Sequence, residues 1–307
     1  MNTDTSKTPL VKEEVTGATP PPAPPAPFRR APSRSSNRMR NNRPSRSMVG
    51  PKFDTTVSTK RETDHIPPLK DGDIRVLHLG GVEEIGRNMS MVEYKDSIVI
   101  IDCGVQFTET HTPGIDFILP NTRYLEEHKH KIKGVVVTHG HLDHIGSIPY
   151  IMPRIGNPQI YARLFTSLMI KKRQEEFPHL SPLTINVVEK GDAITFGDLK
   201  VRFFGVTHAI PDSMGVIIET PYGDIVHTGD LRLEHNDGIP TDDEVDRYKV
   251  FEDRKVLLLM ADSTNCENPG FSISDTVVYK NIENIIDRKS TRLNSSHIQK
   301  SRMPSSA

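Results

Sequence analysis

Short apolar runs that end in polar residues divide the middle of this chain into predicted strands. Apolar and β-branched residues cluster between Gly, Pro, Asp and Asn, a pattern typical of buried strands. The expected strands cover residues 74–81, 89–94, 97–102, 134–138, 159–161, 184–188, 193–196, 199–206, 215–220, 224–227 and 255–261. Helical spacing predicts helices over 121–130, 145–152 and 164–177, the first with Asn121 as its cap. This order predicts an α/β protein in which two sheets pack together with helices outside, an αββα sandwich.

One predicted strand ends in a dense group of polar side chains. An apolar run at 135–137 is followed by Thr138, His139, Gly140, His141, Leu142, Asp143 and His144. Glycine at 140 allows a sharp turn, so the first two histidines can point at the same atom. Neutral imidazoles and carboxylates are common ligands of zinc and similar divalent ions. The offset of Asp143 and His144 from the first pair indicates two neighbouring metals, whereas a metal-free polar turn would leave four side chains in need of separate partners.

Three more candidate residues stand where predicted strands stop. His208 follows the strand at 199–206, and Asp230 follows the strand at 224–227. Strand ends at one edge of a sheet converge in space, so we expect both residues to join the metal site. Asp102 also ends a strand, and we expect it to hold the loop at 138–144 and its imidazoles rather than to bind metal.

The N-terminal stretch, residues 1–68, is predicted to be disordered. A proline run at 20–27 favours extended polyproline geometry and cannot form a core. Up to residue 65 the sequence has 12 Lys and Arg against 6 Asp and Glu, whereas the whole chain has a formal charge of −1. A basic arm of this kind can hold phosphate backbones, and a solvated linker is the alternative. The candidate residues for binding such a backbone are Arg29, Arg30, Arg34, Arg38, Arg40, Arg43 and Arg46.

Composition sets the compartment that we expect. The 307 residues include only two cysteines, too few for a disulfide framework, which is typical of a reducing cytoplasm. The N-terminus has no apolar segment of the kind found in signal peptides. No apolar run is long enough to span a membrane. We therefore predict a cytoplasmic protein without a membrane partner.

The chain resembles the metallo-β-lactamase superfamily, within it the β-CASP RNA-processing nucleases, and most closely the ribonuclease J family. The likeness runs from about residue 73 to 287. It depends on the stretches 79–89, 101–104, 138–144, 207–208, 227–230 and 261–265. The His-x-His-x-Asp-His pattern marks only the superfamily, whereas the opening at 79–89 and the Asp-Ser-Thr-Asn segment at 262–265 mark the family. Glu83 stands where the family pattern has glycine.

The resemblance implies a zinc-dependent ribonuclease with two Zn²⁺ ions, with Mn²⁺ or Mg²⁺ as alternative activators. His139, His141 and His208 would hold one zinc. Asp143 and His144 would hold the second, and Asp230 would bridge both. Asp262 would act as proton donor. The implied substrate is RNA, cleaved as a 5′→3′ exonuclease and/or an endonuclease in rRNA maturation and mRNA decay, by a homodimer or homotetramer when full length.

The resemblance also predicts the domain boundaries. Residues 69–261 would form the first part of the metallo-β-lactamase domain, and residues 262–287 would begin the β-CASP domain, most of which is absent. Residues 288–307 show no apolar periodicity or helix cap, and we expect a non-native tail there, with a genuine polar tail as the alternative. A fragment of this kind should have a weakened second metal site and an exposed apolar face, and little or no activity of its own.

Other functions stay open at this point. A small-molecule metallo-hydrolase, such as a glyoxalase II-like thioesterase, shares the histidine pattern, although the segment at 262–265 and the basic arm argue against it. Another β-CASP nuclease, acting on DNA or on RNA 3′ ends, is a second alternative. A non-catalytic RNA-binding fragment with a structural metal is a third.

Overall fold

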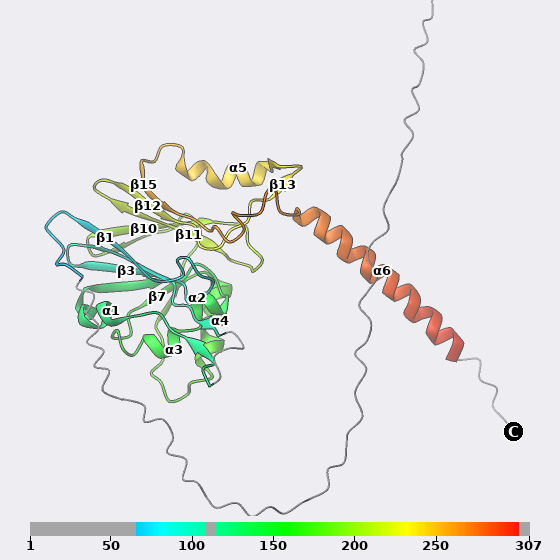
Figure 1. Ribbon diagram of the computed structural model, residues 1–307, viewed down its shortest axis with the longest axis horizontal. Coiled ribbons are helices and arrows are strands. Elements are labelled where there is room, and N and C mark those ends of the chain that lie inside the picture. The colour runs from blue at the N-terminus through cyan, green and yellow to red at the C-terminus, as the bar shows by residue number, and fades with distance from the viewer. Residues whose placement is uncertain (1–65, 109–113, 301–307) are drawn as a thin grey trace, which may run out of the picture. The chain divides into compact units, whose positions relative to one another are not determined.

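Two β-sheets dominate the part of the chain that the computed structural model describes, which is residues 66–108 and 114–300, with side chains to residue 287. Figure 1 shows the two sheets face to face. The first sheet has the order β1 (Ile74–Gly80), β2 (Met89–Tyr94), β3 (Ser97–Ile101), β6 (Ile132–Val136), β7 (Ile160–Ala162) and β8 (Ile185–Val187). The second has the order β15 (Val256–Met260), β12 (Gly223–His227), β11 (Met214–Thr220), β10 (Leu199–Gly205) and β9 (Ala193–Phe196).

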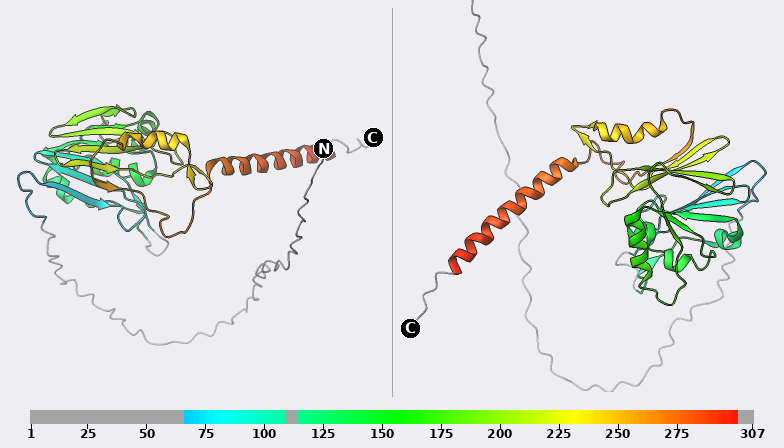
Figure 2. Two further views of the ribbon diagram at one scale, coloured as in Figure 1. Left: turned by 90° about the horizontal axis from the view of Figure 1, so that it is seen from above. Right: turned by 180° about the vertical axis from the view of Figure 1, so that it is seen from behind.

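Helices cover the outer faces of both sheets (Figures 1 and 2). On the first sheet these are α1 (Arg123–Glu127), the 3-10 turn η1 (Lys129–Lys131), α2 (Leu142–Ile145), α3 (Ile148–Ile151) and α4 (Leu164–Gln174). On the second they are α5 (Asp242–Tyr248) and the 3-10 turn η2 (Lys249–Phe251). Two small hairpins pair β4 (Gln106–Phe107) with β5 (Phe117–Ile118) and β13 (His235–Asn236) with β14 (Ile239–Pro240). The expected αββα sandwich is therefore present.

The core between the sheets explains why they stack. β-Branched and aromatic side chains from the first sheet, including Val99 and Val136, pack with Val201, Phe203 and Val216 from the second. Every residue of β2 and β3 is buried, and most of them carry apolar side chains, on both faces of the sheet. A second apolar cluster fills the space between the first sheet and its helices, and a third lies between the second sheet and η2. Strands that are buried on both faces show continuous apolar runs, which is the pattern seen in the sequence.

Strand direction brings the candidate residues to one edge of the sandwich. In the first sheet β3 and β6 are parallel, so Asp102 and Thr138 follow neighbouring carboxyl ends. In the second sheet β10 and β12 both run antiparallel to β11, and β15 is parallel to β12. The carboxyl ends of these three strands therefore share one edge, which places His208, Asp230 and Asp262 together.

Several helix boundaries differ from those expected. The helix predicted over 145–152 is two short helices, and the first, α2, begins at Leu142, within the histidine motif. The helix predicted over 121–130 is shortened to α1 and η1. Asn121 precedes the cap position, which Thr122 occupies, and the Asn121 side chain instead accepts a hydrogen bond from Arg123 N. The helix predicted over 164–177 ends at Gln174, where α4 gives way to a turn before Pro178.

The sequence patterns missed α5, both hairpins and the long helix α6 (Asp275–Lys300). Residues 275–300 form one continuous helix, which the sequence analysis did not assign. The helix has no strong apolar periodicity, which is why the pattern did not reveal it. The interpretation of residues 288–307 as a non-native tail stays a prediction. The predicted disorder of residues 1–68 falls almost wholly outside the described residues.

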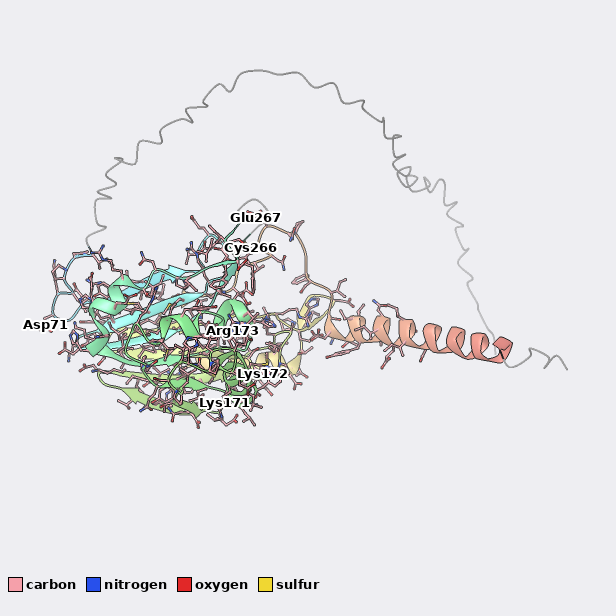
Figure 3. The ribbon with its side chains drawn as sticks, turned by 90° about the horizontal axis from the view of Figure 1, so that it is seen from below. Asp71, Lys171, Lys172, Arg173, Cys266 and Glu267 are labelled. Atoms are coloured by element: carbon pink, nitrogen blue, oxygen red, sulfur yellow. The ribbon has the colours of Figure 1, made fainter. Side chains whose placement is uncertain are left out.

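The edge strand β15 exposes apolar side chains, as the sequence led us to expect. Val256, Leu257, Leu258 and Leu259 are all exposed. One edge of β15 pairs with β12, and within the described ranges no strand pairs with its other edge. Of the two cysteines, Cys103 is buried, whereas Cys266, which is labelled in Figure 3, is exposed. Among the helices that the structure describes, none has the length and apolar character needed to cross a bilayer.

Gly104 offers a test of how tightly the edge of the first sheet is packed against the loop at residues 138–144. A Cβ atom at this position would lie 1.5 Å from the backbone oxygen of Asp143, and backbone cannot move aside cheaply. We expect Gly104→Ala to lower the free energy of unfolding by about 3 kcal/mol or more in urea titrations. Gly156→Ala is the control, because no atom lies within 4 Å of its added Cβ and only the backbone strain of its φ of +90° remains. That strain costs about 1 kcal/mol, so equal losses in the two variants would contradict the packing argument.

Candidate metal centre

The local fold of residues 138–144, the metal loop, separates the four motif side chains into two pairs. His141 has an extended backbone and lies at the N-cap of α2, where its carbonyl accepts hydrogen bonds from the N–H groups of His144 and Ile145. His139 and His141 therefore lie on the extended segment, whereas Asp143 and His144 lie in the first turn of the helix. The two pairs, which are offset in the sequence, therefore have side chains that point in different directions.

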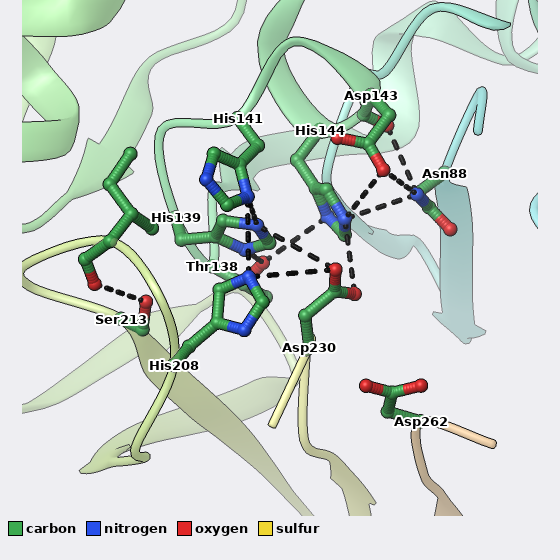
Figure 4. Close-up of polar contacts among 12 residues, drawn as sticks. Asn88, Thr138, His139, His141, Asp143, His144, His208, Ser213, Asp230 and Asp262 are labelled. Carbon is green, nitrogen blue, oxygen red and sulfur yellow. Dashed lines mark hydrogen bonds and ion pairs between the residues drawn. The ribbon is translucent and has the colours of Figure 1, made fainter. Parts of the chain in front are cut away.

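The first group of potential ligands joins three histidines and one aspartate (Figure 4). One ligand atom each from His139, His141, His208 and Asp230 lies within 4.8 Å of all the others. His141 Nδ1 is 3.0 Å from His139 Nε2 and 3.2 Å from His208 Nε2. Zinc–nitrogen bonds of about 2.0–2.1 Å in tetrahedral geometry place ligand atoms about 3.3 Å apart. The spacing of the three imidazoles is therefore compatible with a small divalent cation between them.

The second group consists of Asp143, His144 and Asp230. His144 Nε2 lies 3.5 Å from Asp143 Oδ2 and 3.2 Å from Asp230 Oδ1. It has fewer ligand atoms than the first group and two carboxylates instead of one. We therefore expect it to bind a cation more weakly than the first group does.

Asp230 belongs to both groups through different oxygens. Its Oδ2 faces the first group, 3.9 Å from His139 Nε2 and 3.7 Å from His208 Nε2, whereas its Oδ1 faces His144. A carboxylate with one oxygen toward each cluster can bridge two cations. The geometry supports the expected bridging role, although the ligand roles themselves stay predictions.

Asp102 fixes the metal loop through its contacts with Thr138 and His144. This carboxylate is buried, and its Oδ1 accepts a hydrogen bond of 2.7 Å from Thr138 N. Its Oδ2 accepts a hydrogen bond from the Thr138 hydroxyl at 2.9 Å and lies 2.8 Å from His144 Nδ1. The His144 ring is thereby oriented so that Nε2 points at the second group. These contacts fit the supporting role expected of Asp102, which stays a prediction.

Charge and burial set the protonation of these side chains. Burial, with His144 nearby, lowers the pKa of His139 to about 3, and burial also lowers the pKa of His208. Both imidazoles are therefore neutral near pH 7, as metal ligands must be. Burial opposes a charge on His144, but the carboxylates of Asp102 and Asp230 outweigh it and raise the pKa of His144 to about 10. A cation bound to Nε2 would replace that proton.

Asn88 is a site residue that the sequence analysis did not assign. Its side-chain amide lies 3.1 Å from His144 Nε2 and donates to Asp143 Oδ2 at 3.3 Å. Its backbone N–H donates to the Asp143 carbonyl, and its carbonyl accepts from Gly104 N. Asn88 falls within the 79–89 stretch that carries the family resemblance, so a signal was present in the sequence.

The His208 loop (residues 207–213) is held at both ends by outer helices. At its far end Asp212 accepts a hydrogen bond from Phe165 N at the start of α4 and pairs with Arg163 at 3.1 Å. Asp212 has a φ of +62°, a conformation that aspartate tolerates better than most residues. At the near end the Thr207 hydroxyl donates to Glu244 of α5. The loop therefore joins the outer layers of both sheets.

Asp262 lies at the same edge, outside both groups (Figure 4). Its charge acts on His208, but its carboxylate is engaged elsewhere. Oδ2 accepts a hydrogen bond from Leu231 N at 3.2 Å, and Oδ1 accepts bonds from the N–H and hydroxyl of Thr264. The seven candidate arginines, from Arg29 to Arg46, lie outside the described residues.

Removing single ligands should separate the two groups. We expect His208→Ala to weaken only the tighter of two divalent-ion binding events, because His208 belongs to the first group alone. Asp230→Ala should weaken both events, since each group loses an oxygen. Calorimetric titration of chelator-treated protein measures this directly, with the exposed His179→Ala as control. Loss of both events in His208→Ala, with the fold intact, would contradict two separable groups.

Comparison with known proteins gives relatives over most of the described chain. A ribonuclease J of Mycoplasma pneumoniae is 41% identical over 217 residues, and one of Thermus thermophilus is 40% identical over 230 residues. These matches cover 69% and 72% of this chain but 37% and 39% of the relatives, so the chain spans less than two-fifths of their length.

A crystal structure of a protein of unknown function from Enterococcus faecalis is similar in fold. Its TM-score is 0.50 at 20% identity, and the match covers 65% of this chain and 52% of that one. The profile of the metallo-beta-lactamase superfamily matches residues 82–264, which include every candidate ligand. With two stacked sheets and paired ligand groups at their shared edge, this chain belongs to the metallo-beta-lactamase superfamily.

Proposed function

We propose that this chain carries the metal centre of a ribonuclease of the ribonuclease J type. The observation that carries the proposal is Asp230, whose two oxygens face two separate ligand groups. Two cations held side by side suit the hydrolysis of phosphodiesters. The 37–41% identity to ribonuclease J proteins supports RNA as the substrate. Because the chain spans less than two-fifths of those relatives, their activity is proposed for this chain and not carried over as a fact.

The proposed metals are two zinc ions. His139, His141 and His208 would hold the first, Asp143 and His144 the second, and Asp230 both. Three imidazoles with one carboxylate form a ligand set that favours zinc, whereas the carboxylate-rich second group also suits Mn²⁺ or Mg²⁺.

The proposed chemistry is attack of water on an RNA phosphodiester. When bound, two divalent ions lower the pKa of a water and offset the negative charge of the phosphate. Asp230 would hold both ions through its two oxygens, and Asp102 would keep His144 directed at the second group. Asp262 would protonate the departing alkoxide. Its Oδ2 accepts one backbone N–H among the described contacts, whereas its Oδ1 accepts two hydrogen bonds from Thr264.

The basic arm is the proposed RNA-holding segment. On the described surface the basic residues of α4 shown in Figure 3 are largely paired, with Lys172 contacting Glu175 and Arg173 contacting Glu176. The arginines from Arg29 to Arg46 form a denser set of positive charges in the sequence. We further propose cytoplasmic action in rRNA maturation and mRNA decay, by a homodimer or homotetramer.

The main competing function is hydrolysis of a small thioester. The same metal groups can serve that reaction, so the sandwich alone does not separate the two. The ribonuclease is favoured by the segment at 262–265. This segment begins with Asp262, at the sheet edge that carries the candidate ligands, and Thr264 donates two hydrogen bonds to Asp262. The identity of the relatives points the same way.

The central experiment measures RNA hydrolysis by this chain and by the longest reading frame that contains it. We expect the longer protein to cleave 5′-monophosphorylated RNA with two metals bound. The Asp143→Ala, His144→Ala double variant should lose the second metal and RNA cleavage. Asp262→Asn is the matched variant, because it should keep both metals and still lose about 10²-fold or more in rate. Bound metals with thioester turnover and no RNA cleavage would contradict the ribonuclease proposal.

Removing residues 1–65 tests the arm separately. We expect RNA affinity to fall and its salt dependence to become shallower, because each lost phosphate contact removes a released counterion. The rate at saturating RNA should stay close to that of the intact chain. Fluorescence anisotropy at several salt concentrations gives both quantities. An unchanged salt slope would assign the arm to a solvated linker, whereas loss of all function would favour a non-catalytic RNA-binding protein.

A further inference from the structure

Glu244 is a buried acidic residue that the proposed chemistry does not use. It lies on α5 with 2% of its surface exposed. Its Oε1 accepts a hydrogen bond from the Thr207 hydroxyl and lies 3.7 Å from Arg247 Nε. Its Oε2 is buried without a hydrogen-bond partner among the described residues. A buried carboxylate with one free oxygen costs stability, so packing of α5 alone does not explain this residue.

The helix does not need the Glu244 side chain for its own cap. Thr241 and Glu244 have the spacing of a capping box, in which the glutamate side chain would bond back to the Thr241 N–H. Here the Thr241 N–H donates to the carbonyl of Glu234 instead. Only the other half of the box forms, from Glu244 N to the Thr241 hydroxyl. The Glu244 carboxylate therefore turns inward, toward Thr207.

Thr207 stands directly before His208, and its hydroxyl and its carbonyl both have hydrogen-bond partners. Its hydroxyl donates to Glu244, and its carbonyl accepts a hydrogen bond of 2.7 Å from Arg232 N. The peptide that leads into His208 thus has a fixed orientation. Arg232 also lies two residues after Asp230, so the same contacts join the His208 and Asp230 segments.

The His208 ring lacks the direct side-chain support that the rings of His139 and His144 have. The Thr138 hydroxyl oxygen lies 3.1 Å from His139 Nδ1, and Asp102 Oδ2 lies 2.8 Å from His144 Nδ1. Within the described residues, the hydrogen-bond contact of the His208 ring is Nε2 with His141. Metal-bound histidines usually have a partner on the second ring nitrogen that orients them. For His208, the hydrogen bonds that the structure shows close to the ring are those of the preceding residue, Thr207.

We propose that Glu244 is a positioning residue that fixes His208 for the first metal by holding Thr207. The inference rests on the proposed metal centre and adds α5, an element of the outer layer, to it. The outer helix then supplies through the backbone what a directly bonded partner supplies to His139 and His144.

The test compares metal binding in variants of this pair. Glu244→Ala should weaken the ion at the first group by about 10-fold or more, the usual cost of losing an outer partner, and leave the second event nearly unchanged. Glu244→Gln should restore most of the affinity, because its amide oxygen can accept the same hydrogen bond. Thr207→Val should match Glu244→Ala, and the double variant should be no weaker than either single one. Cobalt substitution provides a spectroscopic signature of the first group in each variant.

Asp243→Ala is the matched control, because this exposed residue lies beside Glu244 in the same helical turn. Parallel weakening of both ions in Glu244→Ala, additive effects in the double variant, or no recovery in Glu244→Gln would each overturn the positioning role. So would wild-type affinity and an unchanged cobalt spectrum in Glu244→Ala. If the unaltered chain binds no divalent ion, the proposed metal centre itself fails, which distinguishes that outcome from failure of the Glu244 role alone.

Discussion

The buried carboxylate of Asp102 is the contact on which the candidate metal centre depends. It stands at the end of β3, beside the parallel strand β6, and ties the backbone and hydroxyl of Thr138 to the ring of His144. One side chain thus fixes where the metal loop begins and where its last ligand points. A buried charge of this kind is tolerated because each of its oxygens has partners. The geometry of the metal loop follows from these hydrogen bonds to Asp102.

The sandwich supplies the second half of the site by strand direction alone. Because β10, β12 and β15 run the same way, His208, Asp230 and Asp262 leave the second sheet at one edge. The first sheet delivers the metal loop to that edge from the other side of the shared core. Two ligand groups with a common aspartate arise where the two edges meet, which is a geometry suited to charge-rich substrates such as phosphodiesters.

Support for the ligands reaches outward into both helical layers. Asp212 connects the His208 loop to the start of α4, and Glu244 connects it to α5. Both contacts join segments more than 30 residues apart in sequence. Asn88 does the same for Asp143 and His144 from the segment that precedes β2. The precision of the site therefore depends on the whole sandwich and not only on the histidine motif.

The sequence by itself determined the strands of the two stacked sheets, the αββα arrangement and the candidate ligands. Apolar β-branched runs and ligand residues at their ends are local patterns, so neighbours along the chain suffice to reveal them. The tertiary structure alone decided which oxygen of Asp230 faces each group, that Glu244 is buried and that Asp262 accepts hydrogen bonds from Leu231 and Thr264. Helix α5 was missed because it is short and mostly polar. The physical reason is that a polar side chain gains its role from a distant partner, and only folding brings that partner within hydrogen-bond reach.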